Sequence, residues 1–447
     1  MWTDSLGNPV TLESQGGLDA LNDFVEGFIA SEARAVNILQ AAVQDASPIV
    51  QACAAAVHMF AESAAAPANA RPFIDRALAL EGQCTPRERR FIHAVQAWVD
   101  GDIRRAIALH EEQAREHPRD LASLKLGQYH LFNRGDAPGM LRIALAALPA
   151  AGDVPYLHGM AAFAWEQCHL LGEAESAARK AIAMRRKEPW AHHALAHVML
   201  TQGRLLEGHA FLQDVSATWT GLNSFMVTHN WWHQALFALE LDRPDEVLGL
   251  YDQRVWGVAK DYSQDQINAA SLLARLELAG VDVGGRWQDL GNYLAERLQD
   301  HVLPFLDMQY LYGLARAGRA EADILMDNIE RHAARAPDDA KAAWQRVCVP
   351  ASRGLLAHAR GEYARAVDEL GQALPRLAQV GGSHAQRDLF AQVRLDALVR
   401  SGELAGAQQL LQQQLQSQPE SARLKRQAAE VYIALGLESV ATSLRWS

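Results

Sequence analysis

The sequence predicts an all-α protein built from stacked helix–turn–helix repeats, and three observations support this fold class. Alanine, leucine, glutamine, arginine and glutamate dominate while β-branched residues are few, which favours helix nearly throughout the chain. A turn glycine followed five positions later by a small residue recurs along the sequence. In three of these copies a proline follows the small residue by twelve positions, a spacing that chance occurrence of common residues does not explain.

The recurring pairs mark the expected turns and second helices. Glycine ends a first helix, the small residue lets two helices approach closely, and proline cannot continue the second helix. Such units cannot bury their apolar faces alone, so we expect them to stack into a single superhelical solenoid. The pairs, in order, are Gly101 with Ala106, Gly172 with Ala177, Gly203 with Gly208, Gly361 with Ala366, Gly402 with Ala407, and Gly436 with Ala441, and the prolines are Pro118, Pro189 and Pro419.

This pattern resembles the tetratricopeptide repeat, a helix–turn–helix of about 34 residues. We predict one continuous array over residues 1–447, with its most regular repeats at about 87–255 and 346–445. The repeats are degenerate at about 280–345, although Gly318 still marks a turn before a second helix. No linker rich in proline, serine and glycine divides the array.

Composition and charge exclude several classes of protein. A net charge of −11 argues against a general nucleic-acid binder, which needs a basic face. No run of 18 apolar residues exists, so we expect no membrane span. The start MWTDSLGNPV lacks the pattern of a secretion signal, and the four cysteines are scattered without a C-x-x-C motif. These features predict a cytoplasmic protein with reduced thiols.

Two histidine pairs stand out, His193 and His197 in WAHHALAHVML (190–200) and His229 and His233 in HNWWH (229–233). Residues four apart share one helix face. In tetratricopeptide-type repeats, positions 2, 5, 9, 12 and 13 of the first helix line the concave groove. With the turn residue at position 15, Gly172, Gly203 and Asp242 set the register. The residues then predicted to face the groove are Glu166, His169, Trp190, His193, His197, His229 and Trp232, with His233 beside it and His192 at a packing position.

We therefore expect the tips of Glu166, His193, His197 and His229 to lie within about 8 to 10 Å of a common point, because first helices of neighbouring repeats are that far apart. We also expect His193 and His197 to line an open groove. Replacing them should then change stability little, whereas replacing His192 should be costly.

Longer strings resemble the tetratricopeptide repeat protein 38 family over about residues 20–430. They include W-A-x-H-A-x-A-H-V from Trp190 and G-G-S-H-A-Q-R-D from Gly381. The resemblance implies an α-helical repeat fold and supplies no reaction. Two departures put the family's site in doubt here. Met199-Leu200 stands where the family has an acidic residue, and Gln309 ends the family's F-x-D-x-H pattern after Phe305 and Asp307.

The string GGSHAQRD allows two interpretations. Ser383 and Gln386 have the spacing of a capping box that opens a helix. The same helix start, with His384 and Arg387 close by, would hold a carboxylate or phosphate.

Three classes of function remain open. The first is a binding protein that holds a small organic or short peptide ligand in a groove lined by histidine, tryptophan and glutamate, without a cofactor. The second is an enzyme whose catalytic candidates are Glu166, His193, His197 and His229, either as acid–base groups or with His193, His197 and one of His229 or Glu166 as three ligands of a catalytic metal. The third is a protein–protein scaffold. We expect no nucleic acid or membrane partner, and a homo-oligomer is compatible with the sequence.

Overall fold

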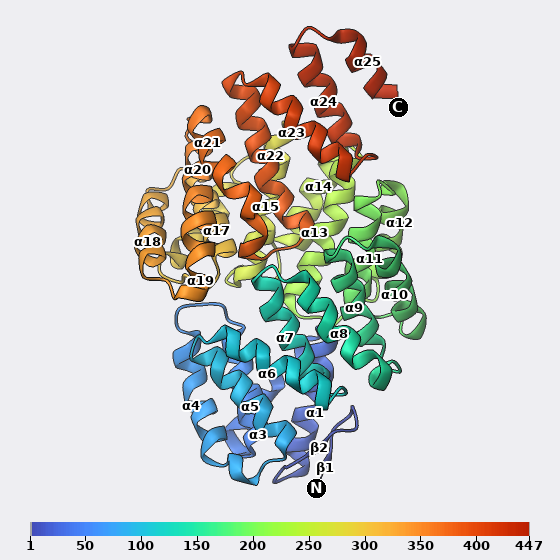
Figure 1. The fold of residues 1–447 in the computed structure, drawn as a ribbon, viewed down its shortest axis with the longest axis vertical. Helices are drawn as coiled ribbons and strands as arrows, with labels where there is room; N and C mark the ends of the chain where they lie inside the picture. Colours follow the sequence, from blue (N-terminus) through green and yellow to red (C-terminus); the bar gives the residue numbers. More distant parts are fainter. Residues whose placement is uncertain (1, 447) are drawn as a thin grey trace. The chain divides into compact units, whose positions relative to one another are not determined.

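The computed structural model describes residues 2–446 and confirms the predicted all-α helical-repeat fold (Figure 1). Consecutive helices pack against one another as helix–turn–helix units, as α9 (Pro155–Gln167) does with α10 (Leu171–Met184). Two short strands, β1 (Trp2–Thr3) and β2 (Pro9–Val10), pair antiparallel near the N-terminus. None of the helices in the described chain is long and apolar enough to cross a membrane. All four cysteines are free thiols.

Contacts between residues divide the chain into two compact units. Unit 1 comprises Met1–Leu195 and Val215–Val227, and unit 2 comprises Ala196–Asp214 and Thr228–Ser447. The division falls inside two continuous helices, α11 (Pro189–Thr201) and α13 (Ser224–Glu240). The single array over residues 1–447 stays a prediction, and each unit is described by itself.

Unit 1 is helical after its strand pair. Its 3-10 segments are Ala33–Asn37 and Glu81–Gln83. Besides α9, α10 and the first half of α11, its helices are α1 (Gln15–Ala30), α2 (Ile38–Gln44), α3 (Pro48–Met59), α4 (Ala66–Ala79), α5 (Pro86–Val99), α6 (Ile103–Glu116), α7 (Leu121–Asn133) and α8 (Ala137–Ala151).

Unit 2 holds the rest of α11 and α13, and a core that includes Trp232, Tyr251, Tyr310 and Phe390. Short helices and a π-helical turn at Trp344–Cys348 fall in or beside the region predicted to be degenerate. Its helices are α12 (Leu205–Ser216), α14 (Pro244–Leu250), α15 (Ser263–Leu278), α16 (Arg286–Leu294), α17 (Pro304–Arg316), α18 (Glu321–Arg335), α19 (Asp338–Ala343), α20 (Val349–Ala359), α21 (Tyr363–Ala373), α22 (His384–Ser401), α23 (Leu404–Ser417), α24 (Ala422–Ala434) and α25 (Glu438–Trp446).

Most of the predicted turns and close approaches are confirmed. Gly203 ends α11 with φ +70, a left-handed conformation that suits glycine. The same conformation occurs at Gly101, Gly318, Gly361, Gly402 and Gly436. The small residue Gly208 is also required, because a Cβ there would lie 2.2 Å from the Phe237 ring of α13.

The register around Gly172 is wrong. Gly172 lies inside α10, and the left-handed residue that follows α9 is His169, with φ +60. The small buried residue five positions later is then Ala174, not Ala177. A histidine occupies the turn because a left-handed conformation favours glycine without excluding other residues. In the corrected register His169 is the turn residue at position 15, and Glu166 moves from position 9 to position 12. The turn at Asp242, with φ +60, is confirmed.

Candidate functional site

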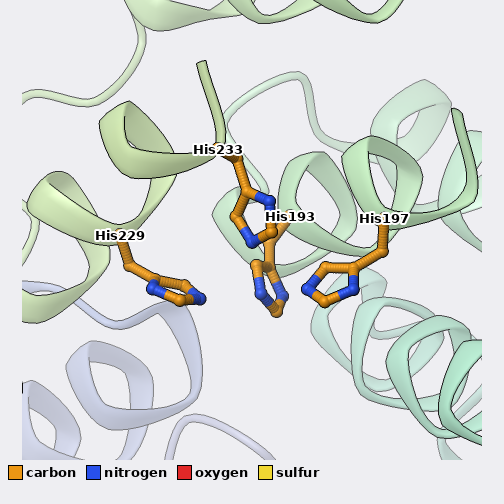
Figure 2. A group of neighbouring side chains, drawn as sticks. All are labelled: His193, His197, His229 and His233. Carbon is orange, nitrogen blue, oxygen red and sulfur yellow. The ribbon is translucent and has the colours of Figure 1, made fainter. Parts of the chain in front are cut away.

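Four histidines on two helices converge in the structure (Figure 2). His193 and His197 lie one turn apart on α11, and His229 and His233 lie one turn apart on α13. Each offers one ring nitrogen, and the four nitrogens lie within 4.8 Å of one another. The four side chains belong to residues that are at most 2% exposed. The i,i+4 spacing on each helix turns both rings of a pair to one face, which brings the four rings together.

Aromatic rings surround the imidazoles. The His197 and His233 ring centroids are 4.5 Å apart, and the His229 and His233 centroids are 4.9 Å apart. His229 stacks on Trp232 with an interplanar angle of 8°. The His193 ring lies 4.8 Å from that of Phe163 on α9. These contacts fix the orientation of the rings.

A chain of hydrogen bonds orients His229. The Nδ1 atom of His229 lies 2.9 Å from Oδ1 of Asn268. The Asn268 amide nitrogen donates to Oγ1 of Thr228, whose hydroxyl donates to Asp265. Because this chain leaves the amide oxygen for the imidazole, His229 donates from Nδ1 and keeps a lone pair on Nε2. An outer-shell acceptor of this kind is the usual partner of a metal-binding histidine.

His229 is also held in its neutral form. Burial, the largest effect, lowers the pKa of His229 to about 3, the hydrogen bond to Asn268 opposes the shift, and the charge of His197 adds to it. A neutral imidazole is the form that binds a metal ion.

The predicted convergence is confirmed for His193, His197 and His229, whose ligand nitrogens are far closer than the expected 8 to 10 Å. The predicted open groove is wrong for these residues, because His193 and His197 are each 1% exposed. His192 is fully buried, as its predicted packing position requires, and contacts Arg186 and Trp219. The larger cost expected for replacing His192 stays a prediction.

Of the other predicted groove residues, Trp190 contacts the cluster, because its ring lies 5.3 Å from that of His193. Glu166 is buried outside the four-histidine group and accepts a hydrogen bond from Gln167. His169 is exposed in its turn. Trp190 donates from Nε1 to Ser31, 2.8 Å away. None of these three residues supplies a ligand atom to the group of four histidines.

On α13, the positions predicted for Trp232 and His233 differ from those in the structure. Trp232, predicted to face the groove, is 0% exposed and part of the hydrophobic core of unit 2. His233, predicted to lie beside the groove, is a full member of the cluster. The spacing of four residues from His229 indicates that His233 shares its helix face. The repeat register placed His233 beside the groove instead, and this assignment was wrong.

At GGSHAQRD the structural interpretation is confirmed. Ser383 and Gln386 form a capping box at the start of α22. Arg387 donates to the carbonyl of Gly382 and lies 3.3 Å from Nδ1 of His384, so it ties the entry loop to the helix. The anion-binding interpretation of this helix start stays a prediction.

Two of the positions at which the chain departs from the family pattern, Met199 and Gln309, are buried, and Leu200 is half-buried. Gln309 is 4% exposed, and its side chain points to the carbonyl of Phe305 at 3.5 Å. Asp307 lies 2.6 Å from Nδ1 of His301, and burial raises the pKa of Asp307 to about 6. Met199 packs in the core with 1% exposure. None of these residues joins the histidine cluster.

Unit 2 also contains a cavity of about 50 Å³ that His197 borders. Its charged lining comes from helices far apart in the sequence: Arg275 on α15, Asp388 on α22, Arg423 on α24 and Glu240 at the end of α13. His384 lines the cavity as well, so one residue of the GGSHAQRD string reaches the neighbourhood of the histidine cluster.

No family model matches the sequence, so the resemblance to the tetratricopeptide repeat protein 38 family stays a prediction. The chain is similar to three solved structures at 11% identity each. A structure of Naa15/Naa10 bound to HypK-THB has a TM-score of 0.26, with 96% of this chain and 67% of that chain covered. A monomeric mutant of IFIT1 with Gppp-AAAA has a TM-score of 0.40, with 89% of each chain covered. The TPR domain of P58(IPK) has a TM-score of 0.23, with 80% and 91% covered. Likenesses this weak carry no argument about function, and the helices themselves define the fold.

Proposed function

We propose that this helical-repeat protein binds a divalent transition-metal ion through the imidazoles of His193, His197, His229 and His233. The observation that carries the proposal is the set of four buried ring nitrogens within 4.8 Å of one another. Zinc–imidazole bonds of about 2.0–2.1 Å place tetrahedral ligand nitrogens about 3.4 Å apart. A bound ion would draw the four ring nitrogens closer together than they lie in this structure.

The donor set favours some ions over others. Four neutral imidazoles suit zinc, copper, nickel or cobalt, whereas calcium and magnesium require oxygen ligands. The hydrogen bond from His229 to Asn268 supports a metal over a purely hydrogen-bonded histidine cluster. The proton of His229 points outward to the amide, so Nε2 is left as an acceptor.

The small organic ligand expected from the sequence is the second part of the proposal. His197 borders the cavity of unit 2, so a ligand there would lie beside the metal site. A site with four protein ligands is typical of a structural ion, whereas three ligands and an open position are typical of catalysis. Because His197 borders the cavity, a small molecule bound there could reach the metal site. This arrangement favours an enzyme as the second candidate function, with the small molecule as its substrate.

The test of metal binding is a titration of the chelator-treated full chain with zinc, copper, nickel and cobalt, followed by desalting and elemental analysis. About one tightly bound ion per chain is expected, and the double variant H229Q/H233Q should lose it. His110, a buried histidine outside the cluster, supplies the matched control H110Q, which should bind like the unaltered protein. Uptake that is absent, or unchanged in H229Q/H233Q, would contradict the proposal.

A further inference from the structure

The cavity of unit 2 contains a buried cation without a carboxylate partner. Arg275 is 2% exposed, yet no carboxylate oxygen of the described residues lies within 4.0 Å of its guanidinium. Its nitrogens donate to Oγ of Ser271 at 2.5 Å and to the carbonyl of Ala385 at 2.6 Å. These neutral acceptors hold the guanidinium in place without balancing its charge.

Burying a charged group without an ion-pair partner opposes folding, because the charge loses its hydration. Removing an ion from water is costly, and burial lowers the pKa of Arg275 to about 10. The guanidinium lies over the Trp232 ring, 5.3 Å from the centroid, so packing fixes its plane. A planar, fixed guanidinium is suited to bind a carboxylate with two hydrogen bonds.

The opposite charge lies elsewhere on the same cavity wall. Arg423 makes ion pairs of 2.8 Å with Glu240 and 3.1 Å with Asp388. These two carboxylates share Arg423 at ion-pair distance, and their charges also raise the pKa of Arg275 against the larger effect of burial. The wall therefore has a positive pole at Arg275 and a negative pole at Glu240 and Asp388.

We infer that this cavity binds a small zwitterion of the α-amino-acid class, with its carboxylate on Arg275 and its ammonium group near Glu240 and Asp388. The volume of about 50 Å³ would hold three or four waters, or the polar end of such a molecule. An anion without an ammonium group would be repelled by the two carboxylates, and a cation alone would be repelled by Arg275. The inference rests on the small-molecule part of the proposed function and does not require the metal ion.

Calorimetric titration of the full chain with glycine tests this, with acetate and methylammonium as ligands that each carry one of the two charges. Glycine should bind saturably and at least about 10-fold more tightly than either, since each charged hydrogen-bonding group contributes about 1.5–3 kcal/mol. The variant R275Q should bind glycine about 10-fold or more weakly. The control R316Q removes an arginine that is ion-paired with Glu277 outside the cavity, and it should bind like the unaltered protein.

If R275Q does not fold by circular dichroism, R275K takes its place, since it keeps the charge and loses the planar fork; weaker glycine binding by R275K is expected. Three results would overturn the inference. They are no binding of glycine, a glycine affinity of the Arg275 variant equal to that of the unaltered protein, and acetate binding as tight as that of glycine. Both chelated and zinc-loaded protein are titrated. Glycine binding to chelated protein would stand even if no metal were taken up, and metal uptake without glycine binding would leave the metal proposal intact.

Discussion

At the scale of single residues, the histidine cluster depends on partners that are not themselves ligands. The amide of Asn268 accepts from His229, and its own orientation is fixed through Thr228 and Asp265. The ligand types are visible in the sequence, but Asn268 is not, because it lies 39 residues beyond His229 on another helix. A lone asparagine in a helix carries no signal of its role until the fold places it beside an imidazole.

Replacing Asn268 should weaken metal binding without abolishing it. The variant N268A removes the acceptor that orients His229, and outer-shell partners of this kind contribute about 10- to 100-fold to metal affinity. Competition with a chromophoric zinc chelator measures the affinity. The exposed Asn292, which accepts from Arg319, provides the control N292A. Equal zinc affinity in N268A and N292A would show that Asn268 does not orient a ligand.

A second prediction concerns His110, which lies outside the cluster. His110 is 0% exposed, its Nδ1 contacts Ser123 at 2.8 Å, and burial lowers its pKa to about 3. The unfolded chain titrates this histidine near its ordinary pKa of 6.5, so the stability contributed by its neutral form is complete above that pH. Stability is then lost as the pH falls from about 6.5 toward 3, because the unfolded state binds the proton more tightly.

Each pH unit in that window should remove up to about 1.4 kcal/mol through His110. Urea unfolding of the unaltered protein and H110Q at several pH values measures this, and H110Q should show a shallower decline. His93, a part-exposed residue paired with Glu81, supplies the control H93Q. If the free energy of unfolding of H110Q fell with pH as steeply as that of H93Q, the argument from burial of His110 would be contradicted.

At the scale of helices, the repeat pattern predicts turns better than it predicts which side chains face each other. Gly203 and Asp242 take the left-handed conformation expected of a turn residue. The error at Gly172 arose because His169, and not the glycine three residues later, takes the left-handed conformation. That displacement of three residues moved Glu166 and His169 onto positions that they do not occupy.

Close helix contact gives a test of the small-residue rule. Alanine at Gly208 would meet the Phe237 ring, so G208A should cost about 1–3 kcal/mol of unfolding free energy from overpacking. Gly172 is the matched control, since it lies in α10 and a Cβ added there would meet no atom within 4 Å. G172A should be neutral or stabilising by up to about 1 kcal/mol, because alanine is the better helix former. Chemical denaturation compares the two, and equal effects would mean that α12 and α13 do not approach closely at Gly208.

At the scale of the whole chain, composition and repeat spacing were sufficient to predict the all-α helical-repeat fold. They also predicted that His193, His197 and His229 would converge, since the i,i+4 pairs lie on successive first helices. They did not predict burial, because a repeat register assigns faces and does not show how closely two faces pack. Arg275 was missed altogether. Within SLLARLELAG it is one basic residue on a helix, and its contact at Ala385 is 110 residues away.

X-ray absorption at the zinc edge of the zinc-loaded full chain tests whether four imidazoles bind one ion. Four histidine ligands predict a first shell of about four nitrogen atoms at 2.0–2.1 Å, with the outer-shell scattering of imidazole rings. The double variant H229Q/H233Q should lose this signal. A first shell of sulfur at about 2.3 Å, or of oxygen without imidazole scattering, would place zinc elsewhere and contradict the four-histidine site.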